Sequence, residues 1–198
     1  THKKPDGTNT TMWNLIPRKL MPPTRLARYC CAVLKETTGR NRFMATGVRW
    51  AESTARKNNR SSLEIIHADR KKSLLLNNDN DEDRRLFETC TLKGKRVCNP
   101  IIDWQESDVW DYLADQHVEC NPLYCEGWHR VGCVGCPMAG KARKKEFARW
   151  SKFRQMYISA FDRMLAERQR RGKMDGSWRM GTTGVDVFHW WMEDGVLP

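Results

Sequence analysis

The sequence contains no apolar run near the ~20 residues that a membrane-spanning helix requires, which excludes an integral membrane protein. Residues 1–5 carry no apolar signal region, and the chain has neither internal repeats nor low-complexity tracts. Hydrophobic residues make up 39% and charged residues 30% of the 198 positions, the mixture of a soluble globular domain with a core. We therefore expect a cytoplasmic protein with no membrane partner.

A net charge of +11 is the strongest bias in the composition. Such an excess of lysine and arginine favours anionic partners, which include nucleotides, nucleic acids and acidic proteins. A basic face that meets only solvent accounts for the same excess equally well.

Eight cysteines occur, and no secretory signal accompanies them. Metal binding in a reducing cytoplasm is therefore a better explanation than a disulfide framework. Two pairs are distinctive: Cys30 and Cys31 are adjacent, and Cys133 and Cys136 form a Cys-x-x-Cys in a glycine-containing segment. Together they offer four thiolates, which suit either a tetrahedral zinc ion or an iron–sulfur cluster.

The adjacency of Cys30 and Cys31 favours the cluster. Consecutive helical side chains point in different directions, so one zinc ion, with its sulfur ligands ~2.3 Å away, is awkward for both thiols to reach. The irons of a cubane occupy separate corners, so two neighbouring thiolates can each bind one and the Cys-x-x-Cys pair the others. The main competitor is a zinc knuckle, and a third alternative is that the cysteines are free or disulfide-bonded. The knuckle would use Cys120, Cys125, Cys133 and Cys136, with Cys90 and Cys98 as ordinary thiols.

The tandem cysteines lie in a predicted helix. Thr24 follows two prolines and is a candidate N-cap, after which apolar residues recur at helical spacing until Gly39. Cys30 falls on the apolar face of this helix, and Cys31 is turned by about 100° from it.

Short apolar segments at 43–48 and around 63–66 predict two strands, of which the first is buried. The charge-rich residues 67–98 predict a loop or insertion. A helix is expected from about 106 to 116, with Val109, Trp110 and Leu113 on its inner face, followed by a Cys/Gly/Pro-rich loop at 120–140.

A long helical pattern begins at Lys141, and an amphipathic helix is predicted at 183–192. The large apolar residues of the long pattern are expected to be core residues and not a cofactor site. They are Phe147, Trp150, Phe153, Tyr157, Phe161, Met164 and Leu165.

Four stretches occur in one order along residues 24–140 and are informative together. They are a tandem-cysteine helix with a following lysine at 30–35, Gly-x-Arg-x-x-x-Ser-x-x-Arg at 47–56, Pro-Ile-x-Asp-Trp-x-x-x-Asp-Val-Trp at 100–110, and Cys-x-x-Cys at 133–136. In this combination the chain resembles the phosphoadenosine phosphosulfate (PAPS) reductase family, including its iron–sulfur adenylyl-sulfate reductases.

The resemblance implies an α/β fold, with part of an adenine nucleotide alpha-hydrolase-like, Rossmann-like domain and its parallel sheet in residues 24–140. Residues 1–23 would be a tail or linker, and residues 141–198 a helical C-terminal extension. It implies a [4Fe-4S] cluster on the tandem cysteines and the Cys-x-x-Cys pair, with Lys35 near the cluster in an electrostatic catalytic role. Substrate binding to the phosphate and sulfate groups would fall to Arg49, Ser53 and Arg56, since arginine forks bind such oxygens in pairs.

Two family segments are absent from the sequence: the phosphate loop Ser-Gly-Gly-x-Asp-Ser and the catalytic Glu-Cys-Gly-x-His. We expect the nucleotide-cradling half on a segment outside this sequence or on another chain, and the attacking thiol likewise.

Three functions remain open at this point. The first is reduction of an adenylylated sulfate to sulfite, with a thioredoxin-like reductant. The second is an ATP-pyrophosphatase that transfers sulfur to DNA or tRNA, for which basic stretches at 141–145 and 168–173 could follow a phosphate backbone. The third is a non-catalytic, metal-stabilised module.

Overall fold

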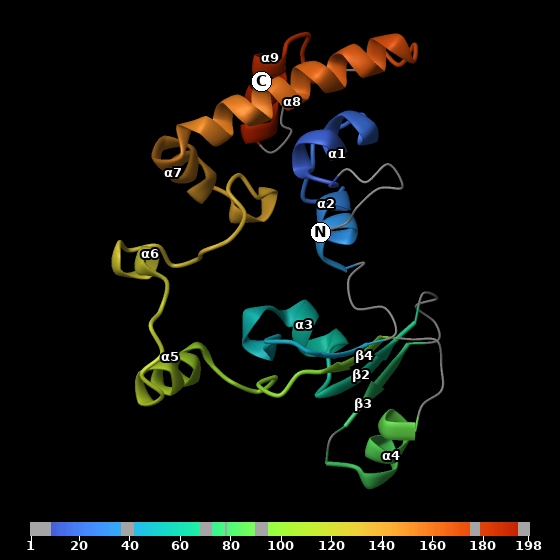
Figure 1. Cartoon of the computed structure of the whole chain (residues 1–198), viewed down its shortest axis with the longest axis vertical. Helices are drawn as coiled ribbons and strands as arrows, with labels where there is room; N and C mark the ends of the chain where they lie inside the picture. Colours follow the sequence, from blue (N-terminus) through green and yellow to red (C-terminus); the bar gives the residue numbers. More distant parts are fainter. Residues whose placement is uncertain are drawn as a thin grey trace. The chain divides into compact units, whose positions relative to one another are not determined.

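The chain divides into two compact units in the computed structural model, which describes residues 9–36, 42–67, 73–77, 79–89, 95–174 and 179–193. Unit 1 comprises Thr1–Thr37 and Arg130–Pro198, and unit 2 comprises Thr38–His129. In Figure 1, the blue and the orange-to-red segments belong to unit 1, and the cyan-to-green segments belong to unit 2. Unit 1 is therefore assembled from two segments that are distant in the sequence.

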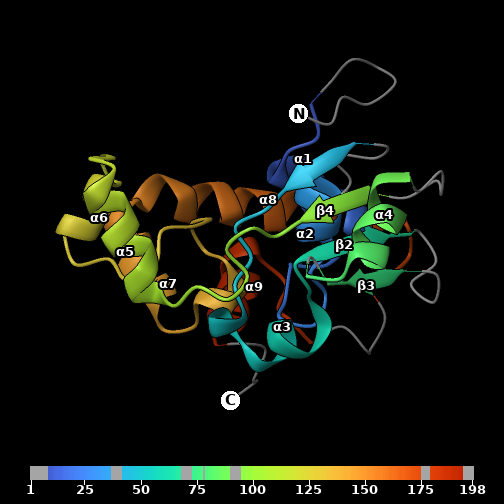
Figure 2. The same ribbon diagram turned by 90° about the horizontal axis from the view of Figure 1, so that it is seen from below.

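The secondary-structure elements that the structure describes in unit 1 are helices and helical turns. Before unit 2 come α1 (Met12–Lys19) and α2 (Tyr29–Cys31), which continues as a π-helical turn (Ala32–Glu36). After unit 2 come a 3₁₀ turn (Pro137–Ala139), α7 (Ala142–Arg149), α8 (Ser151–Arg170) and α9 (Gly184–Met192). The long helix α8 packs against both α1 and α9 (Figure 2). No helix in the described part of the chain is both long and apolar enough to cross a membrane.

The core of unit 1 is built on the apolar face of α8. Tyr157, Phe161, Met164 and Leu165 recur at helical spacing and are all buried, as the sequence predicts. They pack against residues of α1, α7 and α9 in one cluster. Phe153, which belongs to the same pattern, is 36% exposed and so was wrongly expected in the core.

A hydrogen bond and a packing contact connect the N-terminal and C-terminal segments of unit 1. The indole Nε1 of Trp191 in α9 donates to the backbone oxygen of Pro23 at 2.6 Å. Helix α1 carries Ile16 into the core, although residues 1–23 were expected as a tail or linker. The core of unit 1 therefore includes residues of both α1 and α9.

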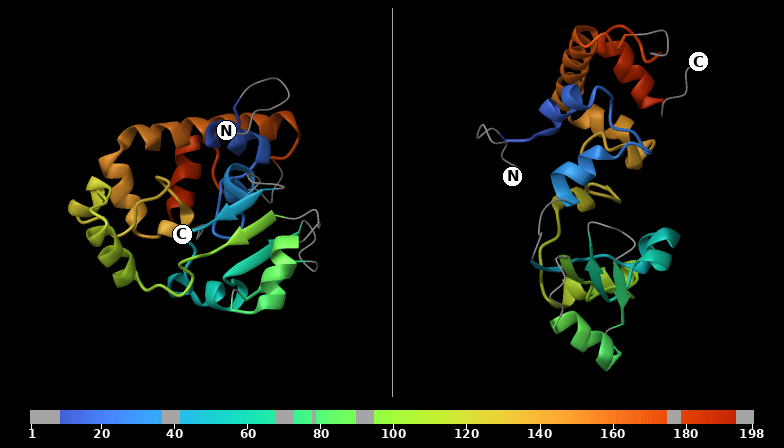
Figure 3. Two further views of the ribbon diagram at one scale, coloured as in Figure 1. Left: turned by 60° about the horizontal axis from the view of Figure 1, so that its bottom comes forward. Right: turned by 90° about the vertical axis from the view of Figure 1, so that its right-hand side faces the viewer.

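The sheet of unit 2 is four-stranded and mixed (Figure 3). Its order is β1-β4-β2-β3, formed by β1 (Phe43–Ala45), β2 (Leu63–Ile66), β3 (Leu74–Leu76) and β4 (Lys95–Cys98). Only β1 and β4 are parallel, whereas β2 runs antiparallel to both β4 and β3. The prediction of a parallel sheet is thus correct for one pair alone. Only residues 67–73 separate β2 from β3. This link is too short for the crossover of a dozen or more residues that parallel neighbours need, which explains why β3 is antiparallel to β2.

Residues 67–98 contain regular structure where a loop was expected: β3, α4 (Asp81–Thr89) and β4. β4 lies inside the sheet, and Val97 is buried in it. Its sequence, Lys-Arg-Val-Cys, shows no apolar pattern. The charged Arg96 is accommodated in the strand because its guanidinium donates to the carbonyls of Phe87 (3.4 Å) and Glu88 (3.2 Å) in α4. β1, expected as buried, is an end strand whose Phe43 is 56% exposed.

The remaining helices of unit 2 are α3 (Thr54–Asn59), α5 (Glu106–Asp115) and α6 (Pro122–Cys125). α5 matches its predicted range, and Asp108 of the family motif caps it by accepting from the Gln105 N–H at 2.8 Å. The predicted inner face of α5 is not buried, since the helix has no buried residue and Trp110 is 37% exposed.

A buried polar network joins three strands of unit 2. The Nδ2 of Asn99, just after β4, donates to the Ser61 carbonyl and to Glu64 Oε1, both at 2.6 Å. The same carboxylate of β2 accepts from Arg60 Nε at 2.8 Å, and Thr46 after β1 donates its hydroxyl to Asn99. Asn99 and Glu64 are both almost fully buried, so every hydrogen bond in the network matters for stability.

Replacing Asn99 with alanine should therefore lower the free energy of unfolding of unit 2 by about 2–3 kcal/mol, because it removes one donor from the buried Glu64 carboxylate and the acceptor of the Thr46 hydroxyl. Urea denaturation measures the change. Asn58→Ala, at an exposed position of α3, is the matched control and should change stability by less than about 0.5 kcal/mol. Equal effects of the two substitutions would contradict the role given to the network.

Candidate functional site

The tandem cysteines sit at the start of a short helical segment of unit 1. The turn before it is closed by the Ala27 N–H, which donates to the Thr24 hydroxyl at 2.9 Å, so the helix begins at Tyr29 and not at Thr24. Tyr29 anchors the segment by donating its hydroxyl to the Met21 carbonyl at 2.7 Å. Cys30 and Cys31 are both half-buried.

The Cys-x-x-Cys pair lies in a tight loop that packs against the aromatic core. The Cys136 N–H donates to the Cys133 carbonyl at 3.1 Å, and Gly135 between them has a φ of +75°. A Cβ at Gly135 would lie 2.5 Å from the Cζ of Phe147, so only glycine fits this approach. The loop is fastened by Tyr157, whose hydroxyl donates to the Val134 carbonyl at 3.1 Å.

A buried carboxylate holds the same loop. Glu146 of α7 is 8% exposed, and its Oε2 accepts the Gly135 N–H at 2.7 Å. Arg143, one turn earlier, is 1% exposed and donates to the carbonyls of Trp191 (2.9 Å) and Met192 (3.2 Å) at the end of α9. In the basic stretch 141–145, which under the second hypothesis could follow a phosphate backbone, Arg143 is therefore engaged inside the protein.

The two cysteine segments meet in unit 1. Arg25 donates its Nε to the Pro137 carbonyl at 3.3 Å, which links the segment before α2 to the residue after Cys136. Burial, with the neighbouring Cys31 and Cys136 thiols, raises the pKa of Cys30 to about 11. Burial first, and then the thiols of Cys133, Cys30 and Cys136, raise the pKa of Tyr157. Folding thus gathers thiols from both pairs around one tyrosine.

The thiols of this unit are the kind of donor that an iron–sulfur cluster uses. Within the described ranges, no three histidine, cysteine, aspartate or glutamate side chains converge as ligands of one metal ion. A zinc site needs its sulfurs ~2.3 Å from a common point, whereas a [4Fe-4S] cluster bonds each thiolate to a different iron. Four thiols in one unit and a glycine-lined loop suit the second requirement. Binding of either metal group stays a prediction.

The remaining predicted residues, which are the alternative zinc ligands and Lys35, do not all lie in one unit. Cys120 and Cys125 belong to unit 2, whereas Cys133 and Cys136 belong to unit 1, so the alternative zinc set is divided between the units. Lys35 lies in the π-helical turn after Cys31 and its side chain is exposed. Its electrostatic role stays a prediction. Cys98 is half-buried in β4, and Cys90 lies outside the described residues.

The predicted anion-binding loop is part of unit 2. A 3₁₀ turn (Trp50–Glu52) leads into α3, and Ser53 caps that helix by accepting the Arg56 N–H at 3.2 Å. The Trp50 N–H donates to the Ile102 carbonyl at 2.7 Å, next to the Asn99 network that supports the loop. One loop therefore brings together all three residues predicted to bind substrate.

Arg49 has unused binding capacity in this loop. Its Nε lies 3.9 Å from Glu52 Oε1, and the same carboxylate is paired with Arg56. The Nη1 of Arg49 is buried and has no hydrogen-bond partner among the described residues. A buried guanidinium nitrogen without a partner is costly, and a phosphate or sulfate oxygen would satisfy it.

Four residues that shape these sites were not singled out as such from the sequence: Tyr157, Glu146, Asn99 and Glu64. Tyr157 was expected only as a core residue. Glu146 had a usable signal, because it is the sole acidic residue between Lys141 and Arg154.

The comparisons with known proteins agree with the motifs. The family model described as "Phosphoadenosine phosphosulfate reductase domain" matches residues 10–139, about two thirds of the chain. The chain belongs to the phosphoadenosine phosphosulfate reductase family. An adenosine 5'-phosphosulfate reductase of Neisseria meningitidis serogroup B is 30% identical over 115 residues, which cover 58% of this chain and 39% of that protein.

Other relatives match shorter segments. An adenosine 5'-phosphosulfate reductase of Burkholderia cepacia is 43% identical over 47 residues, 24% of this chain and 19% of the relative. A 37.8 kDa protein of Escherichia phage 186 is 36% identical over 80 residues, 40% of this chain and 24% of the relative. The chain thus spans less than half the length of these relatives. No solved structure matches it.

Gly135→Ala should destabilise unit 1 by about 2–4 kcal/mol, because it adds both a left-handed backbone strain and a clash with Phe147. Thermal or urea unfolding measures this effect. Gly132→Ala is the matched control in the same loop: a Cβ there meets no atom within 4 Å, so stability should be nearly unchanged. A Gly135→Ala protein as stable as Gly132→Ala would show that the loop does not rest on the core as described.

Proposed function

We propose that this PAPS-reductase-family chain binds an adenylylated sulfate beside a [4Fe-4S] cluster and takes part in reducing that sulfonucleotide to sulfite. The observation that carries the proposal is that two remote cysteine pairs belong to one unit, in which Arg25 before the first pair donates to the Pro137 carbonyl after the second. Relatives named adenosine 5'-phosphosulfate reductase support the choice of substrate. The proposal concerns a whole protein of which the chain covers one part.

The cluster would be held by Cys30, Cys31, Cys133 and Cys136, and when bound it would supply a fixed anionic iron–sulfur group beside the substrate. The chain's own residues prepare that place. Tyr157 and Glu146 hold the Cys-x-x-Cys loop against the core through its carbonyl and amide groups. Arg28 donates to the Cys31 sulfur at 3.4 Å, an interaction that stabilises negative charge on that thiolate.

The substrate's anionic groups would be bound by Arg49, with Arg56 as a second cation and Ser53 as a hydroxyl neighbour. The unpartnered Nη1 of Arg49 supports this assignment, because an arriving oxyanion would replace a missing hydrogen bond. Lys35 would offset the negative charge of the cluster and polarise the sulfate. Reduction also requires a nucleophilic thiol and a phosphate-binding segment, and this sequence contains neither of the family motifs that supply them. It requires a thioredoxin-like reductant as well.

Arg49→Ala should weaken binding of adenylyl sulfate to the full-length protein at least about 10-fold, the loss expected for a charge-assisted hydrogen bond of about 1.5–3 kcal/mol. Isothermal titration calorimetry measures the affinity. Lys57→Ala removes an exposed cation of α3 and should leave the affinity within about twofold. The assignment fails if the two variants bind equally well, or if the unmodified protein binds no sulfonucleotide.

Anaerobic purification should yield iron and acid-labile sulfide in equal amounts, with the visible absorption of a [4Fe-4S] cluster. Cys30→Ser and Cys133→Ser should each abolish it, because each removes a thiolate that binds one iron. Cys98→Ser, a half-buried thiol in the sheet, is the control and should retain the cluster. Zinc in place of iron, lost on Cys120→Ser or Cys125→Ser, would establish the alternative knuckle.

A further inference from the structure

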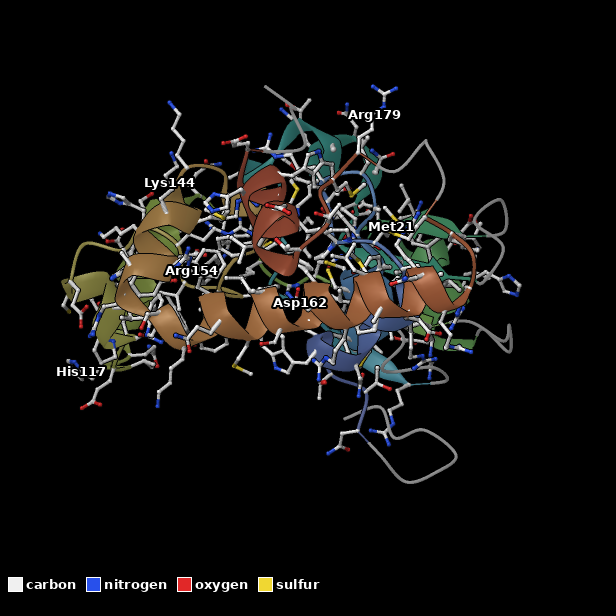
Figure 4. The ribbon with its side chains drawn as sticks, turned by 90° about the horizontal axis from the view of Figure 1, so that it is seen from above. Met21, His117, Lys144, Arg154, Asp162 and Arg179 are labelled. Atoms are coloured by element: carbon white, nitrogen blue, oxygen red, sulfur yellow. The ribbon has the colours of Figure 1, made fainter. Side chains whose placement is uncertain are left out.

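A cavity of about 600 Å³ lies between α7, α8 and α9 in unit 1, and no part of the proposed sulfonucleotide site uses it. Phe147, Phe188 and Met192 form its apolar lining. Four basic side chains besides Arg143 line it: Lys141, Lys144, Arg154 and His189. Figure 4 shows Lys144 extending from α7 and Arg154 near the start of α8, with α9 beside them.

The basic charge continues beyond this cavity. Between residues 141 and 154 the only acid is Glu146, which is buried and bonded to Gly135. Every other charged residue of that stretch except the buried Arg143 is an exposed lysine or arginine: Lys141, Lys144, Lys145, Arg149, Lys152 and Arg154. Among the described residues, Glu193 is the one acid that lines the cavity. We name the cavity and these six exposed residues the α7–α8 basic surface.

The other basic stretch of unit 1 is different in kind. At 168–173, Arg170 and Arg171 both pair with Glu167, and Arg168 donates to the carbonyls of Leu20 (2.8 Å) and Lys173 (2.6 Å). Its arginines therefore have intramolecular roles. Residues 141–154 contain seven lysines and arginines against one acid.

We propose that the α7–α8 basic surface binds the phosphodiester backbone of a nucleic acid. A single nucleotide would occupy the cavity alone, whereas the exposed Lys145, Arg149 and Lys152 extend the positive charge beyond it. Helix α7 has eight residues and is about 12 Å long, and duplex DNA carries one charge per ~1.7 Å of its axis, so several phosphates face a surface of this size. A polyanion thus matches the extent of the charge as well as its sign.

The two aromatic side chains that line the cavity are not available for base stacking, so lysine and arginine side chains make the contacts there. Phe147 is 6% and Phe188 4% exposed, so neither offers a ring face for base stacking. Arg154 lies 5.6 Å from the ring centroid of Phe188, which positions its guanidinium at the cavity. Binding should therefore be insensitive to base sequence and steeply dependent on salt.

The test uses the full-length protein and a short fluorescein-labelled DNA duplex, with fluorescence anisotropy at a series of salt concentrations. The double variant Lys144→Glu/Arg154→Glu should bind at least tenfold more weakly and show a shallower dependence of log K on log salt. The magnitude of the slope should fall by about 0.9 for each phosphate that the variant no longer neutralises.

Arg18→Glu/Lys173→Glu is the matched control, because it makes the same charge change at two exposed positions of unit 1 outside the cavity. Equal weakening by both double variants would overturn the proposal, since net charge alone would then explain binding. Absence of DNA binding by the unmodified protein would also overturn it.

Adenylyl sulfate binding and thermal unfolding serve as checks on folding, and both should be unchanged in the two double variants. If Arg154→Glu disturbs α9, the double variant Lys141→Glu/Lys145→Glu is tested in place of Lys144→Glu/Arg154→Glu. Because the proposed sulfonucleotide site lies on other residues, either proposal can fail while the other stands.

Discussion

The aromatic face of α8 is the constraint on which unit 1 depends. The ring of Tyr157 lies 5.0 Å from that of Trp13, 5.7 Å from that of Phe147 and 4.7 Å from that of Trp191, measured between centroids. Aromatic packing at such distances buries large areas, so segments from the beginning, middle and end of the sequence converge on one residue. The hydroxyl of the same tyrosine donates to the Val134 carbonyl in the Cys-x-x-Cys loop. The position of that loop, and of its two thiols, therefore depends on the packing of the core.

Helix α7 shows how one basic stretch serves two purposes. Arg143 and Glu146 turn inward, and their hydrogen bonds close the end of α9 and the cysteine loop. The lysines and arginines between and beyond them remain exposed and create the α7–α8 basic surface. Because the inward pair has opposite charges and hydrogen bonds to the backbone, its burial is tolerated. The same helix can therefore support the thiol site and present positive charge to a polyanion.

In unit 2 a buried amide and a buried carboxylate play the supporting role. Asn99 and Glu64 tie the ends of β1, β2 and β4 together, and the loop with Arg49 follows directly after β1. A loop that rests on satisfied buried groups is held in place before any ligand arrives. Preorganisation of this kind reduces the entropy lost on binding, which would favour the proposed binding of an anion by Arg49.

The sequence by itself determined the family, through four motifs in order, and the core of unit 1, through aromatic residues at helical spacing on α8. It also determined α5 and α9, whose local patterns are strong. Only the tertiary structure decided that β4 lies inside a mixed sheet, that Arg143 points inward and that residues of the first helix belong to the core. The reason is physical: a charged or short polar segment becomes buried only when partners from distant segments satisfy its hydrogen bonds, and no local pattern contains those partners.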